Sequence, residues 1–329
     1  MIIRILNAEE VARALPMSDA IEEMKEAFEQ LSSGGVTLPL RSRIHVEGAN
    51  GTSLFMPALL HASGDMAIKI VSVFPQNLEH NLQTVHAIVI TLDSQTGQPI
   101  AILEGGSLTA IRTGAASGAA TDLLARPEAS SLAIIGCGTQ ARTQLEAVCT
   151  VRSIERVWVY SLDSPGARVF ASEMRGTGPI PLEITVVDRA ADAVARADII
   201  CTATTSSTPV FNGRDLRPGT HINAIGSYTP EMQEIDAETI QRARVVVDSR
   251  EAALAETGDL IIPIQTGDYT AASIHAELGE IFLGIEKGRT DPRQITLFKS
   301  VGIAVQDVVA AARALENAVA LDLGTVIHL

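Results

Sequence analysis

The chain has 329 residues, of which 46% are hydrophobic, and a formal net charge of −14. Its length allows a large core in two domains, and its negative charge argues against nucleic acid or an anionic membrane as a partner. The N-terminal segment soon turns acidic, and no apolar run approaches the ~20 residues that a membrane helix needs. We therefore expect a cytoplasmic protein without a signal peptide or membrane segment.

The first part of the chain predicts a mixed α+β domain. A capping box at residues 7–10 opens a short helix that Pro16 ends, and Ser18 is expected to cap the next helix. The hydrophobic period then changes to two, which predicts strands. These strands cover residues 41–47, 52–57, 66–73, 84–92 and 99–103. Because short turns join them, we expect antiparallel pairing.

A glycine-rich turn follows the apolar run 132–135 and precedes a helical pattern. It reads Gly136-Cys137-Gly138-Thr139-Gln140-Ala141, which is G-x-G-x-x-A between a strand and a helix. Gly136 permits the sharp bend, Gly138 removes a side chain where backbone approaches a pyrophosphate, and Ala141 lets helix and strand pack closely. The first N–H groups of the helix attract phosphate. We predict a dinucleotide site here; the alternative is an ordinary βα turn.

Alternating strands and helices continue after this turn. Further strands are expected at 156–161, 183–187, 198–203, 220–225 and 244–248, with short helices at 190–197 and 237–243. This rhythm predicts a Rossmann-type, doubly wound parallel sheet. A small-residue helix at 107–125 leads into it, and the last long helix, 301–321, is expected to pack on the first domain. The predicted domains are 1–125 with 305–329, for substrate binding and dimerisation, and 126–304, for the dinucleotide.

The strand pattern places one lysine where burial of its charge is energetically unfavourable. Lys69 lies mid-strand among apolar neighbours, and alternation places it on one face with Ala67 and Val71. An unpaired buried ammonium is costly, so a partner anion is implied. The alternative is a lysine on a solvent-facing edge.

Arg112 is also a charged residue without an evident anion partner, in a helix of small residues. Neighbouring helical positions carry no acid, and a guanidinium there can grip a carboxylate or phosphate with two hydrogen bonds. Arg41 and Arg43 begin the first strand and can reach the same place. These cations predict a focused anion site within an acidic protein. The alternatives are surface arginines, or an ion pair of Arg112 with Glu104.

The sequence offers little support for other chemistries. The histidines share no metal-ligand spacing and H-E-x-x-H does not occur, so we expect no metal site. No G-x-S-x-G motif supports a serine nucleophile. The three cysteines have no C-x-x-C spacing, and Cys137 is interpreted as filler in the glycine turn.

Several segments, in one order, resemble the ornithine cyclodeaminase/mu-crystallin family over essentially the full chain. The matching stretches are Arg43-Ile44-His45, Phe55-Met56-Pro57, Ile68-Lys69-Ile70-Val71, Phe74-Pro75-Gln76-Asn77, Leu82-Gln83-Thr84-Val85, Ala110-Ile111-Arg112-Thr113-Gly114-Ala115-Ala116, the glycine turn, Asn223-Ala224-Ile225-Gly226 and Phe298-Lys299-Ser300-Val301-Gly302. The resemblance implies a homodimer built through the first domain. It also implies that substrate lies between that domain and the nicotinamide ring of the cofactor.

The resemblance further implies which residues form the site. Arg43, Lys69 and Arg112 hold the substrate carboxylate, in agreement with the charge argument. With the glycine turn included, the residues expected to bind the cofactor are Thr84, Arg112, Thr113, Gly136, Gly138, Thr139, Gln140, Ala141, Ser161, Asp163, Thr204, Ala224, Ile225, Gly226, Ser227 and Lys299.

The chain departs from part of the family at Tyr228. Cyclodeaminases and the related alanine dehydrogenases carry an Asp there, and that carboxylate handles the substrate amino group. A phenol titrates near pH ~10 and is no equivalent base, so cyclodeamination is disfavoured. Lys299 instead resembles the mu-crystallin branch, whose members reduce cyclic ketimines.

The cofactor preference depends on the end of the second nucleotide strand. NAD enzymes place an acid there for the ribose 2′-hydroxyl, whereas this chain has Ser161. Serine does not repel a 2′-phosphate, so NADPH is favoured, with Arg142 and Arg168 as candidate phosphate partners. Asp163 can reach back and reverse this preference, so NADH is the alternative.

The sequence therefore leads to one hypothesis, an NAD(P)H-dependent reductase of cyclic imino acids. Its substrates are Δ1-piperideine-2-carboxylate and Δ1-pyrroline-2-carboxylate, which give pipecolate and proline. Lys69 is the first candidate to supply or position the proton for the imine, and bound water is the second. The alternatives are an ornithine cyclodeaminase or alanine dehydrogenase on the same site, and a non-catalytic protein that binds a small ligand with NADPH.

Overall fold

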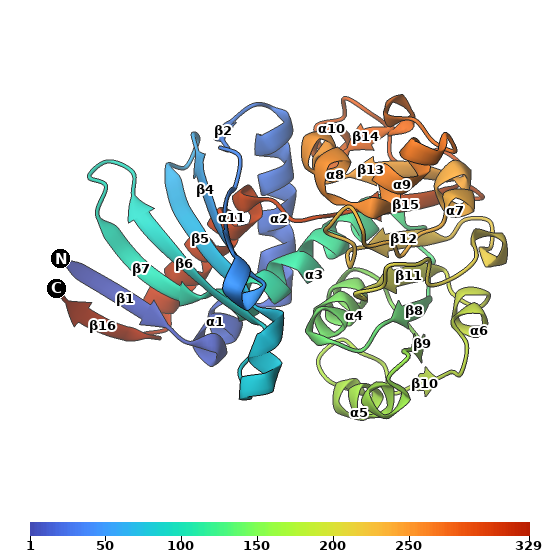
Figure 1. Cartoon of the computed structure of the whole chain (residues 1–329), viewed down its shortest axis with the longest axis horizontal. Helices are drawn as coiled ribbons and strands as arrows, with labels where there is room; N and C mark the ends of the chain where they lie inside the picture. Colours follow the sequence, from blue (N-terminus) through green and yellow to red (C-terminus); the bar gives the residue numbers. More distant parts are fainter. The chain divides into compact units, whose positions relative to one another are not determined.

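The computed structural model describes residues 1–329, with the exception of the Leu78 side chain. The residues form two compact units: unit 1 is Met1–Arg112 with Ile303–Leu329, and unit 2 is Thr113–Gly302 (Figure 1). The division lies inside helix α3 (Gly105–Leu124), whereas the sequence-based division kept that helix in the first domain. Functional boundaries at 125 and 305 stay a prediction. Among the described residues, no helix is long and apolar enough to cross a membrane.

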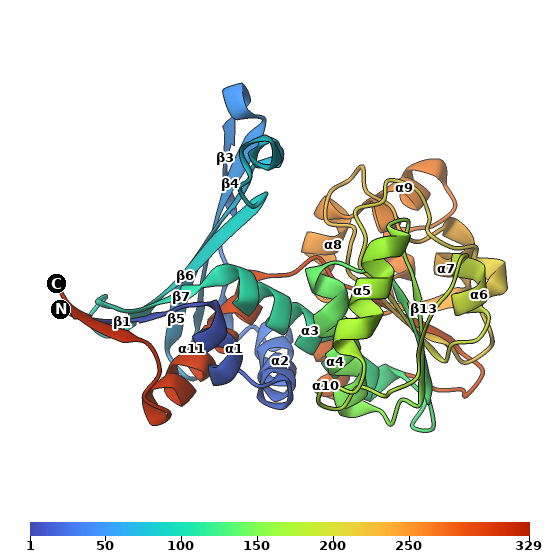
Figure 2. The same ribbon diagram turned by 90° about the horizontal axis from the view of Figure 1, so that it is seen from below.

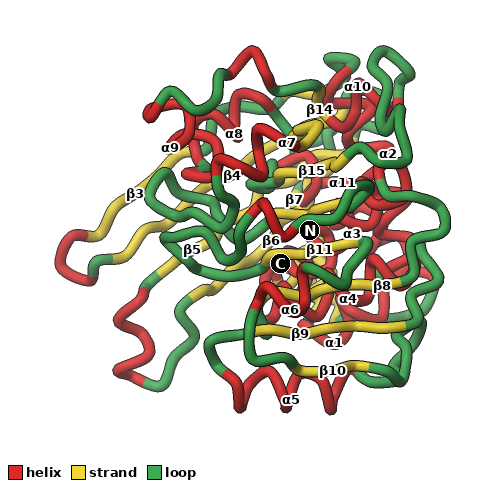
Figure 3. Tube along the Cα trace, turned by 90° about the vertical axis from the view of Figure 1, so that its right-hand side faces the viewer, coloured by secondary structure: helices red, strands yellow, loops and turns green.

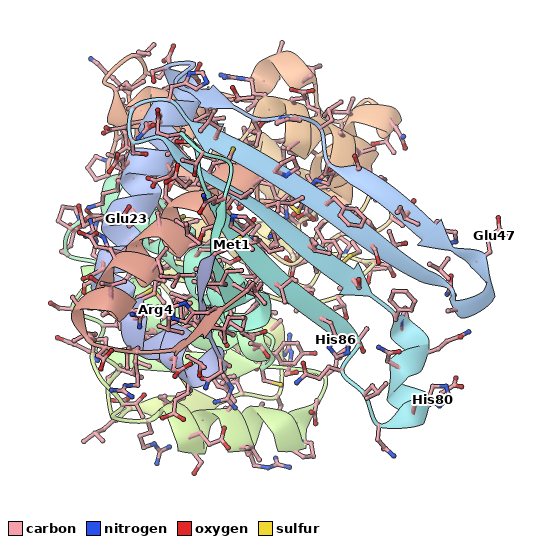
Figure 4. All side chains as sticks on the ribbon, turned by 90° about the vertical axis from the view of Figure 1, so that its left-hand side faces the viewer. Met1, Arg4, Glu23, Glu47, His80 and His86 are labelled. Atoms are coloured by element: carbon pink, nitrogen blue, oxygen red, sulfur yellow. The ribbon has the colours of Figure 1, made fainter. Side chains whose placement is uncertain are left out.

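Unit 1 is built on a mixed sheet of eight strands. They are β1 (Ile2–Leu6), β2 (Val36–Thr37), β3 (Ser42–Val46), β4 (Gly51–Leu60), β5 (Asp65–Val73), β6 (Val85–Asp93), β7 (Pro99–Glu104) and β16 (Thr325–His328). Their order is β16-β1-β7-β6-β5-β4-β2, with β3 also beside β4. Pairing is antiparallel from β3 to β7, as predicted, while β1 joins β7 in parallel. Figure 4 shows Glu47 and His80 at the tips of the connections η1 (Glu47–Ala49) and η2 (Pro75–His80).

Three helices complete unit 1: α1 (Ala8–Ala14), α2 (Met17–Ser32) and α11 (Ala304–Ala320). The predicted capping box is confirmed, since Asn7 and Glu10 exchange backbone-to-side-chain hydrogen bonds. The predicted cap at Ser18 is wrong. Pro16, with its φ fixed at −58°, is the N-cap of α2, and the Ser18 hydroxyl donates to the Asp19 carboxylate. The last long helix packs against the first sheet and α2, as expected.

Register divides the first sheet into two different faces. Met56, Lys69 and Val89 lie directly opposite one another on β4, β5 and β6, so their side chains share a face. Helix α11 contacts these three strands, and the three residues are buried. Ile70, the residue after Lys69 on β5, points to the opposite face and pairs with Ile88 of β6. Ile88 is 40% exposed. Within unit 1, helices α1, α2 and α11 all lie on one side of the sheet (Figure 2), so these helices leave the other, apolar face uncovered; we call it the open face.

Unit 2 contains an eight-stranded sheet in which every pairing is parallel. The strands are β8 (Ser131–Ile135), β9 (Arg156–Tyr160), β10 (Ile184–Val186), β11 (Ile199–Thr202), β12 (His221–Ala224), β13 (Ala243–Val247), β14 (Ala276–Glu277) and β15 (Ile295–Lys299). Their order is β10-β9-β8-β11-β12-β15-β13-β14, and Figure 3 shows β8, β9 and β10 side by side. The chain leaves β8 to build β9 and β10 on one side and β11 and β12 on the other. This reversal confirms the predicted Rossmann-type, doubly wound sheet.

Short helices separate the strands of unit 2. They are α4 (Thr139–Val151), α5 (Ser164–Met174), α6 (Ala190–Val194), α7 (Ala237–Arg242), α8 (Arg250–Glu256), α9 (Gly258–Thr266) and α10 (Leu278–Phe282), with 3-10 turns η3 (Gly213–Asp215) and η4 (Ala271–Ser273). Two apolar clusters form the core: one contains Leu145 and Phe170, the other Ile222 and Leu297. Apolar side chains on both faces explain why the strands read as continuous hydrophobic runs.

One central strand of unit 2 was not predicted. β15 inserts between β12 and β13, although it follows both in the sequence. A fully buried five-residue run has no periodicity that distinguishes strand from helix. The last long helix also begins at Ala304 rather than at residue 301, because the N–H groups of Val301 and Gly302 donate to Asp248.

Candidate functional site

The glycine turn has the geometry of a phosphate cradle. Gly136 has a φ of +111°, and a Cβ there would overlap the carbonyl oxygen of Ala203, so a side chain is excluded. Gly138 is the N-cap of α4, and a Cβ on it would project into open space. Thr139 and Gln140 open the helix, and buried Ala141 faces the core. The free N–H groups of this helix N-terminus therefore fit a pyrophosphate.

The end of β9 is the position at which Rossmann-type sheets usually contact the ribose of a nucleotide. Ser161 follows the strand and its hydroxyl oxygen accepts hydrogen bonds from Cys137 Sγ at 3.3 Å and the Asp163 N–H at 3.2 Å. The Asp163 carboxylate caps α5 by accepting from the Gly166 N–H at 2.9 Å. Of the two candidate phosphate partners, Arg142 pairs with Glu173 and stacks on Phe170, and Arg168 is exposed on α5.

A buried carboxylate, Glu234, joins two loops that sequence analysis assigned to the cofactor. Its Oε1 accepts from both the backbone N–H and the hydroxyl of Thr204, each at 2.7 Å. Its Oε2 accepts from the Gly226 N–H at 2.7 Å and from the Thr202 hydroxyl at 2.8 Å. Burial raises the pKa of Glu234, and the neighbouring Asp259 carboxylate raises it further. One side chain thus fixes the carboxyl ends of β11 and β12.

Lys299 lies beneath the same loops. It is fully buried, and its ammonium forms an ion pair with Asp259 at 3.0 Å. Asp259 in turn accepts from the N–H groups of Glu234 and Ile235, at 2.6 and 2.9 Å. Within unit 2 the ammonium therefore acts on the loops through Asp259 and Glu234.

The remaining predicted loop residues also gather at this edge. Ala224 ends β12, and Ile225 and Ser227 are buried just beyond it. The Ser227 hydroxyl donates to the Met232 carbonyl at 2.7 Å. Tyr228 is 48% exposed next to them.

In unit 1 the structure brings Lys69 and Arg112 together on a carboxylate that sequence analysis missed. Asp307, in the first turn of α11, has Oδ2 2.6 Å from Lys69 Nζ and Oδ1 3.0 Å from Arg112 Nε. Gln306 Oε1 accepts from Arg112 Nη1 at 2.9 Å. Lys69, Arg112 and Asp307 are 3%, 5% and 1% exposed. The buried lysine therefore has an anion partner that belongs to the protein itself.

The charges of this cluster perturb one another. Burial lowers the pKa of Lys69 to about 8: Asp307 opposes the shift, while Arg112 and Arg41 add to it. Burial raises the pKa of Asp307, but Lys69 and Arg112 outweigh that effect and bring the pKa below its ordinary value. Two cations share one anion, so the three side chains carry a net positive charge near neutral pH.

The two arginines predicted to begin a strand at residue 41 occupy different positions around this cluster. Arg41 is half-buried, whereas Arg43 is exposed on β3. Arg43 pairs with Leu54, which pairs with Val71, so the Arg43 side chain shares the face of Lys69 one row away.

Neither sequence-based alternative for the buried cations is found. Lys69 is not on an exposed edge, and the Glu104 carboxylate caps α3 by accepting from the N–H groups of Gly106 and Ser107. The sequence did not predict Asp307 as the partner of Arg112, because the two residues are 195 positions apart. Its signal in the sequence is the polar pair Gln306-Asp307 between the apolar residues Val305 and Val308.

Two predicted cofactor residues, Thr84 and Thr113, belong neither to the Lys69–Arg112–Asp307 cluster nor to the loops held by Glu234. The Thr84 carbonyl, just before β6, accepts from the Phe74 N–H at 2.8 Å. The Thr113 carbonyl, in α3, accepts from the Gln144 side chain of α4 at 3.2 Å. A Cβ on neighbouring Gly114 would overlap the backbone of Thr143, so this glycine is needed for α3 to approach α4 closely. Among the residues that the structure describes, no group of His, Cys, Asp or Glu is arranged to hold a metal.

The fold and these residues define a two-unit protein of the dinucleotide-binding class, with a Rossmann-type sheet in one unit and, in the other, a mixed sheet beside which Lys69 and Arg112 are buried with Asp307. Comparison with known proteins gives the family. The chain belongs to the ornithine cyclodeaminase/mu-crystallin family, whose model matches residues 3–321. This confirms the family resemblance found in the sequence.

Individual relatives match over nearly their full lengths. The chain is 41% identical to a Δ1-pyrroline-2-carboxylate reductase of Bacillus cereus over 97% of this chain and 98% of the relative. It is 44% identical, with a TM-score of 0.93, to the Δ1-pyrroline-2-carboxylate reductase of Thermococcus litoralis solved with NADH and L-proline, covering 98% and 99% of the two chains. An archaeal alanine dehydrogenase dimer with bound NAD is 35% identical, with a TM-score of 0.93 and complete coverage of both chains.

Proposed function

We propose that this protein is an NAD(P)H-dependent reductase of cyclic imino acids, converting Δ1-pyrroline-2-carboxylate to proline and Δ1-piperideine-2-carboxylate to pipecolate. The observation that carries the proposal is full-length similarity, at 41% and 44% identity, to two Δ1-pyrroline-2-carboxylate reductases. The predicted class of enzyme is thereby confirmed. The buried cations of unit 1 supply a chemical reason for a carboxylate substrate.

In this proposal the substrate carboxylate binds Arg112, Lys69 and Arg43. A guanidinium and an ammonium on a rigid sheet and helix fix the carboxylate, and with it the adjacent C=N bond. The Lys69 ammonium stands near the imine nitrogen and supplies its proton, since a pKa of about 8 suits a donor near neutral pH. When bound, the reduced nicotinamide supplies the hydride to the imine carbon.

The glycine turn and the loops held by Glu234 form the proposed cofactor site in unit 2. Gly136, Gly138 and the start of α4 take the pyrophosphate. We further propose that NADPH is preferred to NADH, because Ser161 stands at the end of β9 and the Asp163 carboxylate is bound to the first turn of α5. The ratio of kcat/KM for the two cofactors tests this preference, and a ratio that favours NADH overturns it.

We propose a cytoplasmic homodimer that forms through the open face of the first sheet. This face carries Phe55, Ile68, Ile70, Ile88 and Ile90, which are half-buried or exposed in the single chain. Contiguous exposed apolar surface of this kind is typical of an interface. The related archaeal alanine dehydrogenase is a dimer.

A panel of reactions tests the proposed activity. Purified protein is incubated with NADPH or NADH and each of the two cyclic imines, and nicotinamide absorbance is followed. Ornithine with NAD⁺ and alanine with NAD⁺ run beside these assays. Reduction of either imine supports the proposal. Net NADH formation from alanine, without imine reduction, would show instead an alanine dehydrogenase, the second candidate, which the 35% identity to that enzyme favours. Proline and ammonia from ornithine would show a cyclodeaminase.

A further inference from the structure

The two oxygens of Asp307 serve two different cations. Oδ2 lies 2.6 Å from Lys69 Nζ on β5, and Oδ1 lies 3.0 Å from Arg112 Nε on α3. The next residue back, Gln306, holds a second edge of Arg112, and its own Oε1 is fixed by the Ile303 N–H at 3.2 Å. The first turn of α11 is thus a clamp on both cations.

The groups around Lys69 show that the Asp307 carboxylate determines whether the lysine stays protonated. The ionisable groups that face the ammonium are Asp307 from α11, Arg112 from α3 and Arg41 ahead of β3. Its neighbours across the sheet, Met56 and Val89, are apolar. Two of the three charges repel the ammonium and burial deprives it of water, so Asp307 alone among them opposes loss of the proton.

We propose that Asp307 is a positioning residue of the substrate site, which keeps Lys69 protonated in a buried position and holds the Arg112 guanidinium ready for the substrate carboxylate. The inference rests on the proposed function for the identity of the carboxylate. It adds a residue from α11 to a site for which the sequence indicated only cations from the sheet and α3. Asp307 does not react; it acts through Lys69 and Arg112.

The test measures binding of pyrrole-2-carboxylate as a function of pH by calorimetry. This planar analogue keeps one carboxylate, and nothing in it titrates between about pH 6 and 10, so the pH dependence belongs to the protein. Wild-type protein should bind with constant affinity up to about pH 8 and then lose about tenfold per pH unit, as the Lys69 ammonium is lost.

Asp307→Asn keeps the shape of the side chain and removes its charge. We expect at least about tenfold weaker binding at pH 7, and a loss of affinity that starts at least about one pH unit lower than in the wild type. Asp307→Glu should return the pH dependence toward that of the wild type. An unchanged pH dependence in Asp307→Asn would overturn the inference.

Two further variants separate this role from a merely structural one. Glu23→Gln removes the ion pair of α2 with Arg313 of α11, 2.6 Å long, without touching Lys69, and should leave the pH dependence unchanged (Glu23, Figure 4). If Asp307→Asn unfolds, Lys69→Met combined with Asp307→Asn leaves no unpaired lysine, and should show the same flat pH dependence as Lys69→Met alone. A remaining effect of residue 307 on that dependence contradicts the inference.

Failure of this inference is distinct from failure of the proposed function. Wild-type protein that binds the analogue with the expected pH dependence, yet reduces neither imine, would overturn the activity and leave Asp307 in its role. Active wild-type protein with an Asp307→Asn variant of unaltered pH dependence would do the reverse. Wild-type protein that does not bind the analogue at all would overturn the role of Asp307 in carboxylate binding.

Discussion

Replacing Glu234 by glutamine is predicted to loosen the proposed cofactor site. Each carboxylate oxygen accepts one backbone N–H, from Thr204 or Gly226, and one hydroxyl, from Thr204 or Thr202. The glutamine amide can accept on one side only, because its NH₂ group meets a backbone donor on the other. The hydroxyls can rotate, but the backbone N–H cannot.

The structure sets the size of this effect. One buried N–H left without an acceptor costs about 1–3 kcal/mol. Weaker repulsion with Asp259 offsets part of this cost, so we expect unit 2 to lose about 1–2 kcal/mol. Cofactor binding must then supply the free energy that orders these loops. Because 1.4 kcal/mol corresponds to a factor of ten in Kd, cofactor affinity should fall about tenfold.

Urea unfolding followed by tryptophan fluorescence measures the stability of unit 2, because the single tryptophan, Trp158, lies on β9. Calorimetric titration with NADPH measures the affinity. Glu231→Gln, the same substitution at an exposed position of the same loop, is the control and should match the wild type. Equal stability and affinity in Glu234→Gln and Glu231→Gln would refute the reasoning.

Three further predictions concern other parts of the molecule. Gly136→Ala should weaken cofactor binding at least about tenfold, since φ of +111° is strained for alanine and its Cβ overlaps backbone; unaltered NADPH titration would contradict this. Burial lowers the pKa of His221 to about 3, so the unfolded chain binds the extra proton first, and unit 2 should lose about 1.4 kcal/mol per pH unit below about pH 6.5. Urea unfolding at several pH values should show this slope flattened in His221→Gln. Ile88→Glu, on the open face of the first sheet, should convert the proposed dimer to monomer in light scattering, and a persistent dimer would exclude that face.

The sequence predicted those features that are encoded locally. The turn from Gly136 to Ala141 could be interpreted because a strand, two glycines and a helix are contiguous. The antiparallel strands showed alternation, and the capping box of α1 lies within four positions. Lys69 and Arg112 stood out because a charge among apolar or small neighbours is costly wherever the chain places it.

Features that depend on tertiary pairing were not predicted. Asp307 and its two partners come from three distant segments, and no local pattern connects them. β15 takes its place between β12 and β13 out of sequence order, and its five residues are too few to show a period. Glu234, in a loop, and Asp259, in the first turn of α9, were not predicted because acids at such positions usually face water. Here six backbone or side-chain donors, together with the Lys299 ion pair, hold the two carboxylates inside.

The discontinuity of unit 1 has a consequence for how the chain matures. Lys69 and Arg112 are synthesised before unit 2, but Asp307 emerges only after all of unit 2 has left the ribosome. Until then Lys69, on the first sheet, and Arg112, on α3, lack the carboxylate that pairs with both of them. Translation must therefore run past residue 307 before Asp307 can pair with these cations. A protease that cuts ahead of α11 and releases this helix would remove the counter-ion of Lys69 and Arg112 and leave the sheet of unit 2 uncut.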